Sequence, residues 1–536
     1  MNMQSEGKVK SFFYRANQRF SVSQAAWLLA GSTLIASLLG LLRERLLIAN
    51  FGIGAEVDAY KAAFTLPDFM FILLTSGALS VTFIPVFVER MSSGNKQSAW
   101  QLSNSLLNLF ALVTGATSIL IIIFAGPIIE YLVAPGLAPD TQALAADMMR
   151  IIALNPLLFS ISSVLTSIQQ SVGRFFFYAL APALYNVGII LGIIFVAPHF
   201  GIVGVAIGVV IGSIIQMLAS IIGMINLGFS YEPLIHWRNQ GFSRVLSLLP
   251  PRTLDQGADY INILVETNLA SRLKDGAITA YQTAFTLHMV PITLIGVAIS
   301  TAAFPQLSQR MAQHRPDLFK KDLTSVLRVI IWLVLPASVI AYFGRGYLVR
   351  LVVADGNAEI ATLLGLLVIA IAFRSVFHLL TRSYYAQQDT KTPLYISLIA
   401  IGLNVALAIL LARPDAYGIY GLALAQSIAA AFEALVLVTV LIRRFDGLVT
   451  DDLVSGLVRM LAASLATAVM TYLLIAYVLP LRASDVGFFA LVPKFATIVV
   501  ASFAFYTYIS YVLGLRESSP IINRIRNLIF RPVRVQ

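Results

Sequence analysis

The sequence predicts an all-α protein that crosses a membrane many times, and three observations carry this prediction. The 536-residue chain is 58% hydrophobic and only 12% charged, whereas soluble domains are about 45–50% apolar and about 25% charged. Its apolar residues form long blocks of the roughly 20 residues that a bilayer requires. Its basic residues gather in alternate connections between those blocks. A soluble globular enzyme and a disordered chain are both excluded.

Fourteen apolar blocks are long enough to span the bilayer. They are 22–50, 58–88, 104–132, 142–170, 175–197, 200–227, 247–272, 277–308, 324–354, 358–386, 393–412, 417–442, 453–480 and 487–515. Several exceed the length that a perpendicular span needs, which implies tilted helices or helices that project beyond the bilayer. We therefore expect 14 transmembrane helices.

The charges between the spans predict the orientation. With the N-terminus in the cytoplasm, the cytoplasmic segments carry 23 Lys and Arg residues and the outer segments carry 4, where Arg252, Arg272 and Arg382 near the ends of their spans are counted with the adjoining segment. A miscounted helix would invert every later loop and remove this bias, so both termini are expected in the cytoplasm. The net charge of +11 is explained in the same way, and no nucleic-acid partner is expected.

A weak internal repeat divides the first twelve spans into two halves. Ala59–Leu66 returns as Ala280–Leu287 with six of eight residues identical at an offset of 221. Three shorter matches follow in order: Pro85 with Pro305, Gln169-Gln170 with Gln387-Gln388, and Gly201-Ile202 with Gly418-Ile419. Six helices per half is an even number, so both halves share one orientation and are related by an axis along the membrane normal.

This repeat predicts the domain organisation. The expected parts are a cytoplasmic N-terminal segment 1–21, an N-lobe 22–227, a cytoplasmic linker 228–246, a C-lobe 247–442, two extra C-terminal helices in 453–515 and a basic cytoplasmic tail 516–536. Two parallel six-helix bundles would surround a central cavity, and rocking one against the other would open it to alternate sides.

No catalytic or cofactor signature is present. The chain has no cysteine, and its five histidines show no metal-ligand spacing. There is no phosphate-binding loop with a Lys-Ser/Thr pair and no dinucleotide fingerprint. The run Gly204-xxx-Gly208-xxx-Gly212 is typical of close helix packing in membranes. We expect no catalytic residue, no metal site and no cofactor.

Ionisable residues inside spans are the remaining candidates, because they are costly in a bilayer and usually face water or a partner. Arg43, Glu44 and Arg45 lie in the second half of the first span. Asp58, Lys61 and Asp68 share one face of the second. Lone cations occur at Arg374, Arg459 and Lys494, of which the last two are expected to extend to the membrane surface.

The seventh span carries the sharpest polar pattern. Asp255, Asp259, Asn262 and Glu266 stand at i, i+4, i+7 and i+11 and form one stripe on an otherwise apolar helix. Two interpretations have about equal weight. In the first, the stripe pairs internally with Arg43, Arg45 or Lys61 and holds the halves together. In the second, it is a Na⁺ or proton site that couples transport to an ion gradient or to the membrane potential, or a gate made from those same pairs.

Two motif regions resemble one known family. The first contains Gly40-Leu41-Leu42-Arg43-Glu44 and, further on, Gly77-Ala78-x-Ser80-x-x-Phe83-Ile84-Pro85. The second is Tyr385-x-x-Gln388-Asp389-x-Lys391-Thr392-Pro393. Both resemble the MurJ/MviN lipid II flippases of the MOP superfamily, which also contains the MATE drug exporters. The 14 helices and the 6+6+2 layout agree with that family.

The resemblance implies a transporter that moves undecaprenyl-pyrophosphate-linked peptidoglycan precursor from the inner to the outer leaflet. Its partners would be the bilayer, a polyprenyl-pyrophosphate-linked glycan and the cell-wall synthesis machinery. Arg43 would bind the pyrophosphate with help from Lys61, beside Glu44 and Asp58. Other cationic positions of the family are replaced here by Ser37, Phe71, Ile72 and Thr286.

Four alternatives remain open. The chain could flip another lipid-linked glycan, because only Arg43 of the usual cationic cluster matches. A MATE-like cation-coupled antiporter is disfavoured by the two extra helices and by the motif at Gln388–Pro393. A polyprenyl-dependent glycosyltransferase is disfavoured, because the outer loops of this chain have no recognisable pair of acidic residues. A scaffold that has lost transport is compatible with the missing arginines.

Overall fold

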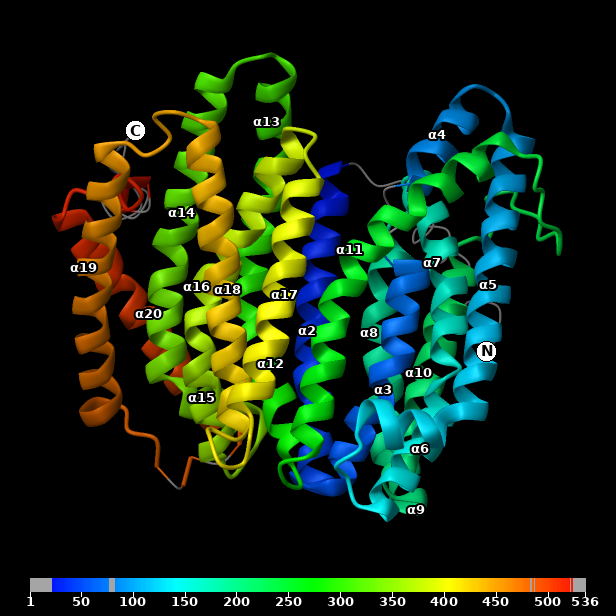
Figure 1. Ribbon diagram of the computed structural model, residues 1–536, viewed down its shortest axis with the longest axis horizontal. Coiled ribbons are helices and arrows are strands. Elements are labelled where there is room, and N and C mark those ends of the chain that lie inside the picture. The colour runs from blue at the N-terminus through cyan, green and yellow to red at the C-terminus, as the bar shows by residue number, and fades with distance from the viewer. Residues whose placement is uncertain (1–21, 77–81, 483, 486, 521, 524–536) are drawn as a thin grey trace, which may run out of the picture. The chain divides into compact units, whose positions relative to one another are not determined.

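The computed structural model describes residues 22–76, 82–482, 484–485, 487–520 and 522–523, and within these ranges it contains helices and no strand (Figure 1). Eleven helical segments of the described chain are long and apolar enough to cross a membrane. The predicted all-α membrane class is therefore confirmed.

The eleven segments match predicted spans three to six and eight to fourteen. They are Lys96–Val133, Pro139–Ser171, Phe176–Phe200, Ile202–Ile222, Ala277–Ala312, Pro316–Phe343, Ala358–Ala386, Lys391–Leu411, Ile419–Arg444, Asp451–Val478 and Phe488–Val512. The other three predicted spans coincide with helices that carry intramembrane charges: α2 (Val22–Phe51), α3 (Ala55–Phe71) with the π-turn η1 (Ile72–Ser76), and α11 (Gln240–Ser271). The count of fourteen stays a prediction.

The chain divides into two compact units, Met1–Thr279 and Ala280–Gln536. The described helices of unit 1, besides α2, α3, η1 and α11, are α4 (Ile84–Ser92), α5 (Lys96–Pro127), η3 (Ile128–Val133), α6 (Pro139–Ile152), α7 (Asn155–Ser171), α8 (Phe176–Leu191), η4 (Gly192–Val196), α9 (Ala197–Phe200) and α10 (Ile202–Ile222). Helix α11 begins at Gln240, seven residues before the predicted start at 247, and packs on α3, η1 and α5.

The remaining described helices belong to unit 2. It contains α12 (Ala277–Pro291), which starts at the boundary, η5 (Ile292–Val297), α13 (Ala298–Ala312), α14 (Pro316–Phe343), α15 (Arg345–Val352), α16 (Ala358–Ala386), α17 (Lys391–Leu411), α18 (Ile419–Arg444), α19 (Asp451–Leu473), η6 (Leu474–Val478) and α20 (Phe488–Val512). Span 324–354 was predicted too late along the chain, because its helix already starts at Pro316 and ends at Phe343.

The internal repeat is visible in the backbone. The α3–η1–α4 succession of unit 1 corresponds to α12–η5–α13 of unit 2, each with a π-turn that follows a proline-containing helix. Gly201 and Gly418, paired in the sequence repeat, have φ angles of 58° and 54° and precede α10 and α18. Only glycine adopts such a backbone without a steric cost. The repeat therefore extends from residue identity to local conformation.

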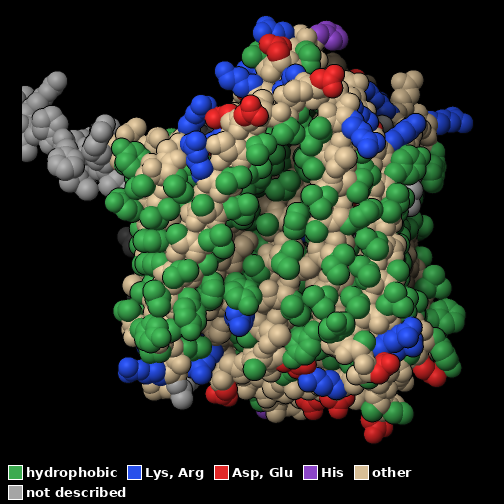
Figure 2. All heavy atoms as spheres, turned by 60° about the vertical axis from the view of Figure 1, so that its left-hand side comes forward, with side chains coloured by type: hydrophobic (Ala, Val, Ile, Leu, Met, Phe, Trp, Pro, Cys, Tyr) green, Lys and Arg blue, Asp and Glu red, His purple; other side chains and the backbone are tan. Residues whose placement is uncertain are grey.

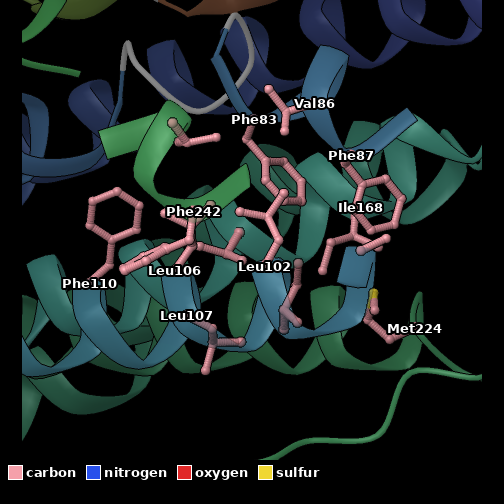
Figure 3. Close-up of a cluster of buried hydrophobic side chains, with 14 residues drawn as sticks. Phe83, Val86, Phe87, Leu102, Leu106, Leu107, Phe110, Ile168, Met224 and Phe242 are labelled. Carbon is pink, nitrogen blue, oxygen red and sulfur yellow. The ribbon is translucent and has the colours of Figure 1, made fainter. Parts of the chain in front are cut away.

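A compact apolar core holds the ends of several unit 1 helices together (Figure 3). Phe83 and Phe87, at the start and in the middle of α4, pack with Leu102 and Leu106 of α5 and with Phe242 of α11. All five side chains are fully buried. Burial of one such side chain contributes about 1.5–3 kcal/mol, so this cluster holds α4 and the first turn of α11 against α5.

Close glycine contacts join α8 and η4 to α10. A Cβ atom added to Gly208 would lie 2.6 Å from the Cα atom of Gly192, and one added to Gly212 would lie 2.5 Å from the carbonyl oxygen of Tyr185. The two backbones touch, which only glycine permits. The packing role predicted for Gly204, Gly208 and Gly212 is thus seen directly.

The outward faces of the last helices are apolar. Figure 2 shows one face of the molecule, on which hydrophobic side chains form a broad band and charged side chains gather above and below it. Leu465 and Val469 of α19 and Val500 of α20 are 70%, 60% and 67% exposed. Such exposure is costly in water and favourable in lipid.

Candidate functional site

Arg43 and its surroundings form the candidate site, built on α2, α3 and α8 of unit 1. The guanidinium of Arg43 donates a hydrogen bond to Asn186 Oδ1 at 3.2 Å. Asn186 Nδ2 donates in turn to the carbonyl oxygens of Ala36 and Pro182, which orients the amide oxygen toward Arg43. Arg43 is half-buried, and no carboxylate pairs with it in the described ranges. A neutral partner leaves guanidinium donors for an anion.

Lys61 lies in the same region but is already paired. Its Nζ atom is 2.5 Å from Glu44 Oε1, and the two side chains are 8% and 16% exposed. The Lys61 ammonium also lies within electrostatic range of Asp58. The ion pair joins α2 to α3, and its acid is the residue directly after Arg43.

Asp58 is committed to a different task. One carboxylate oxygen accepts hydrogen bonds from the backbone N–H and the hydroxyl of Thr279, at 2.7 and 2.6 Å. The other accepts from the N–H of Gly276 at 2.7 Å. Asp58 is fully buried, so these donors satisfy its charge in place of water. This arrangement holds the N-terminus of α12 and gives Asp58 a structural role.

Sequence reasoning missed three charged or polar neighbours of Arg43. Asp68 and Tyr185 both lie within electrostatic range of the guanidinium, as does Tyr60. Asp68 was recognised as an intramembrane acid on the face of Asp58 and Lys61, but not as a neighbour of Arg43. Asn186 was noticed only through its repeat partner Asn404. A rule that pairs each intramembrane cation with polar residues on other spans would have found Asp68 and Asn186.

The α11 stripe is partly described. Asn262 and Glu266 are 7% and 4% exposed, and Asn262 Oδ1 has no hydrogen-bond partner in the described part of the chain. The side chains of Asp255 and Asp259 lie outside the described residues. The opposite face of α11 contacts α3 through Tyr260, whose ring stacks on Phe69 at 6.3 Å. The predicted link between the stripe and Arg43 or Arg45 stays a prediction.

The family motif at Gln388–Pro393 forms a clamp between two helices of unit 2. Asp389 accepts hydrogen bonds from the N–H groups of Lys391 and Thr392 and from the Thr392 hydroxyl. It also pairs with Arg444 at 2.6 Å. Burial alone would raise the pKa of Asp389, but the bonds from Thr392 and Arg444 outweigh it and lower the pKa to about 2. Gln388 has a positive φ of 59°, and Pro393 lies in the first turn of α17.

The remaining family-motif positions are mostly structural. Gly40 lies beside Asn186, since a Cβ added there would be an ordinary 3.9 Å from its Oδ1. Pro85 lies in the first turn of α4, where a missing N–H costs nothing. Gly77 lies outside the described residues.

Two cations expected to stand alone have partners. Arg374 of α16 pairs with Glu433 of α18 at 3.1 Å, with side chains 18% and 4% exposed. Lys494 pairs with Asp485 at 2.6 Å instead of extending to the membrane surface by itself. Glu433 lies 59 residues from Arg374 in the sequence, so only the tertiary packing of α16 on α18 brings the two side chains together.

Comparisons with known proteins agree on one family. The family described as Lipid II flippase MurJ matches residues 48–493. A probable lipid II flippase MurJ of Bdellovibrio bacteriovorus is 28% identical over 518 residues, 94% of this chain and 97% of that protein. A lipid II flippase MurJ of Burkholderia cenocepacia is 28% identical over 383 residues, 69% of this chain and 74% of that protein.

Solved structures show the same likeness. A lipid II flippase MurJ in an inward closed conformation has a TM-score of 0.75 at 25% identity and covers 91% of this chain and 99% of its own. An inward-facing MATE family multidrug transporter of the MOP superfamily has a TM-score of 0.67 at 15% identity, covering 77% and 95%. The second likeness concerns the fold alone.

Proposed function

This chain belongs to the MurJ family of lipid II flippases, and from that premise we propose that it moves lipid II from the inner to the outer leaflet by alternating access. The observation that carries the proposal is the family match, which extends over residues 48–493. A two-fold repeat of one orientation supports a rocking mechanism. The chain acts as a transporter, so no residue is assigned a catalytic role.

Arg43 is the residue that we assign to the lipid headgroup. Lipid II carries an anionic pyrophosphate, which cannot cross hydrocarbon without charged or polar partners. The planar fork of Arg43 can hold two phosphate oxygens at once, and its present hydrogen bond goes to a neutral amide. Replacing the Asn186 oxygen by a phosphate oxygen exchanges a neutral hydrogen bond for a charge-assisted one, which is stronger.

Lys61 and Glu44 have a secondary role in this scheme. Their ion pair is largely buried, and breaking a buried pair without replacement is costly. A pyrophosphate that approached Lys61 would supply the replacement charge, and Glu44 would turn away. Ligand binding would then change the contact between α2 and α3, which is the kind of differential interaction that can shift a conformational equilibrium.

The experiment that tests the headgroup assignment replaces Arg43. Arg43→Ala should lower lipid II translocation in proteoliposomes by about 10–100-fold, since a hydrogen bond to a charged group contributes roughly 1.5–3 kcal/mol. Arg43→Lys should recover part of the activity, because it restores the charge without the fork. Protein yield and thermal stability are measured alongside.

Arg459→Ala is the matched control for Arg43→Ala. Arg459 is an exposed arginine on α19 whose only hydrogen bond in the described chain is a long one of 3.4 Å to the Leu513 carbonyl oxygen. Its replacement should leave translocation unchanged. Full activity of Arg43→Ala, or an equal loss in Arg459→Ala, would rule out the headgroup assignment while leaving the family membership intact.

A second candidate substrate is another polyprenyl-linked glycan. The specific observation behind it is that Ser37, Phe71, Ile72 and Thr286 stand where the family usually has cations. Fewer cations would suit a headgroup with less charge. Parallel translocation assays with lipid II and with a polyprenyl-linked glycan that has no peptide would separate the two substrates. Only one of the two lipids should be translocated in a way that depends on Arg43.

A further inference from the structure

A pocket with a volume of 770 Å³ opens in unit 1, where α4 ends and where α5 and α11 begin. Its lining includes Arg90, Ser98, Gln101, His236, Trp237 and Arg238. The pocket lies at one membrane boundary, because the span that contains α5 starts at Lys96. The charge bias assigns this boundary to the cytoplasmic side. Nothing in the proposed transport path uses it.

The segment before α11 is fixed along α5 and gives the pocket a defined wall. Asn104 Nδ2 donates to the Ser230 carbonyl oxygen at 2.9 Å. The His236 N–H donates to Ser105 Oγ at 2.8 Å. Asn239 Nδ2 donates to the Ser98 carbonyl oxygen at 3.0 Å, and its Oδ1 accepts from the first N–H groups of α11. Residues 236–239 are therefore held in place before any ligand arrives.

The pocket carries positive charge that its lining does not neutralise. No Asp or Glu is among the lining residues, and in the described part of the chain neither Arg90 nor Arg238 forms an ion pair. The nearby acids contact other side chains than the two arginines: Glu89 binds Arg244 at 3.0 Å, and Glu232 binds His236 of the lining at 3.2 Å. Two guanidinium groups thus face one cavity without a counter-ion.

Arg90 is held against the start of α11. Its guanidinium donates to Ser98 Oγ, and a Cβ added to Gly241 would lie only 2.8 Å from its Cζ atom. Glycine at position 241 therefore leaves the space that the guanidinium occupies. One edge of Arg90 is fixed by these contacts, and its remaining N–H groups are available to a ligand.

We propose that this pocket binds a phosphate-bearing ligand at the cytoplasmic membrane boundary, distinct from the transported lipid at Arg43. Paired arginines suit phosphate oxygens. The hydroxyl and amide side chains of Ser98 and Gln101 suit the hydroxyl groups of a glycerol or sugar. Trp237 is 62% exposed at the rim and is the kind of side chain that lies at a lipid headgroup layer. The ligand is a phospholipid headgroup or a free phosphate compound.

The first test arm uses phospholipid. Purified protein is mixed with phosphatidylglycerol or with phosphatidylethanolamine and the retained lipid is counted by native mass spectrometry. Arg90→Gln with Arg238→Gln should retain about tenfold less phosphatidylglycerol than the unchanged protein. The matched control is Lys321→Gln with Arg443→Gln, which removes the same charge at exposed positions of unit 2 and should retain phosphatidylglycerol normally.

The second arm uses inorganic pyrophosphate with the protein in lipid-free detergent. Both the otherwise unchanged protein and the pocket variant carry Arg43→Ala here, so that the headgroup site does not bind the probe. If pyrophosphate raises the melting temperature of the unchanged protein and not that of the pocket variant, while phosphatidylglycerol retention is equal in both, the ligand is a soluble phosphate compound. Arg238→Gln alone guards against misfolding, because Arg238 makes no hydrogen bond to the described residues. Equal behaviour of pocket and control variants in both arms would overturn the proposal.

Discussion

At the scale of single residues, two acids of this protein, Asp58 and Asp389, accept hydrogen bonds from the start of a helix. Asp58 accepts two backbone N–H groups and a hydroxyl before and within α12. Asp389 does the same at the start of α17 and adds an arginine. Unpaired N–H groups and the helix dipole make a helix N-terminus favourable for an anion. Both acids therefore hold segments together, and Arg43, with its neutral partner, is left for the ligand.

The clamp at Asp389 predicts a pH-dependent contribution to stability. The pKa of Asp389 is about 2 in the folded protein, below the roughly 3.9 of an unfolded chain. A lowered pKa stabilises the fold above the unfolded value, and this contribution is lost as the pH falls toward 2. Asp389→Asn should therefore melt at a lower temperature than the unchanged protein at pH 6, and the difference should shrink between about pH 4 and pH 2.

Melting temperatures measured at pH 6, 4 and 3 in detergent would check this dependence. Asp415→Asn, at an exposed loop position, serves as the control and should match the unchanged protein throughout. A difference for Asp389→Asn that stays constant down to the lowest pH, or widens, would contradict the clamp.

At the scale of elements, α10 and α11 differ in how many polar side chains they carry. α10 is almost without polar side chains and packs by backbone contact against α8 and η4. α11 has one face on α3 and a polar stripe elsewhere. The backbone contacts of α10 with α8 and η4 form a rigid wall. On α11, by contrast, the buried Asn262 Oδ1 has no hydrogen-bond partner in the described chain. Membrane helices keep such groups mainly for ion pathways or for structural pairs.

A substitution at Gly208 should disrupt the rigid wall. Its added Cβ would meet the Cα of Gly192 at 2.6 Å, and no flexible side chain can move away. Gly208→Val should lower the melting temperature and the yield of folded protein, with a cost of about 1–3 kcal/mol or more from overpacking. Gly402→Ala, a helical position on α17 with nothing within 4 Å, should be neutral or stabilising. Equal stability of the two variants would show that the backbones are farther apart.

The α11 stripe predicts how transport is driven. Asp259→Asn with Glu266→Gln removes two carboxylates of the stripe, and Glu266 is buried. If these acids bind Na⁺ or a proton, the double variant should lose the dependence of translocation on the ion gradient or on the membrane potential while still binding lipid II. Translocation in proteoliposomes with and without an imposed gradient would measure this.

Two observations would return the stripe to a purely structural role. One is an unchanged gradient dependence in the double variant, and the other is a loss of folded protein that matches the loss of transport. Asn262→Ala provides a milder comparison, because it removes an uncharged oxygen of the stripe and leaves the acids in place.

At the scale of the whole molecule, the chain is a succession of two similar units with two added helices. The α3–η1–α4 succession of unit 1 recurs as α12–η5–α13 in unit 2, and Gly201 and Gly418 share a positive φ. The apolar core of α4, α5 and α7 likewise has a counterpart in α13, α14 and α16. A repeat of six spans, the number that the sequence predicts, is even and keeps its orientation in the membrane.

The orientation of the whole chain can be tested with single cysteines, since the natural sequence has none. Ser93→Cys and Asn523→Cys lie at exposed positions and should resist a membrane-impermeant thiol reagent in intact cells. Asp415→Cys, on the opposite side, should react. Ser518 is unsuitable because it is fully buried and donates to the Leu515 carbonyl oxygen. Labelling of Ser93→Cys or Asn523→Cys in intact cells would show that the predicted topology is wrong.

The sequence by itself determined the class of fold, most of the spans, the repeat and the family. These follow from patterns that are local or periodic: the length of apolar blocks, the bias of loop charges, and motifs such as Gly40–Glu44 and Gln388–Pro393. Arg43 could be singled out for the same reason, because a charge within an apolar block is visible without any structure.

Only the tertiary structure decided which charges meet. Lys61 bonds to Glu44, 17 residues away on another helix, while Asp58 bonds to Thr279, 221 residues away. Arg374 reaches Glu433, and Asn186 reaches Arg43. A sequence pattern reports which face of its own helix a residue occupies, but the partner depends on how helices distant in sequence rotate and pack. The same packing built the pocket at Arg90 and Arg238, whose walls come from three separate stretches of the chain.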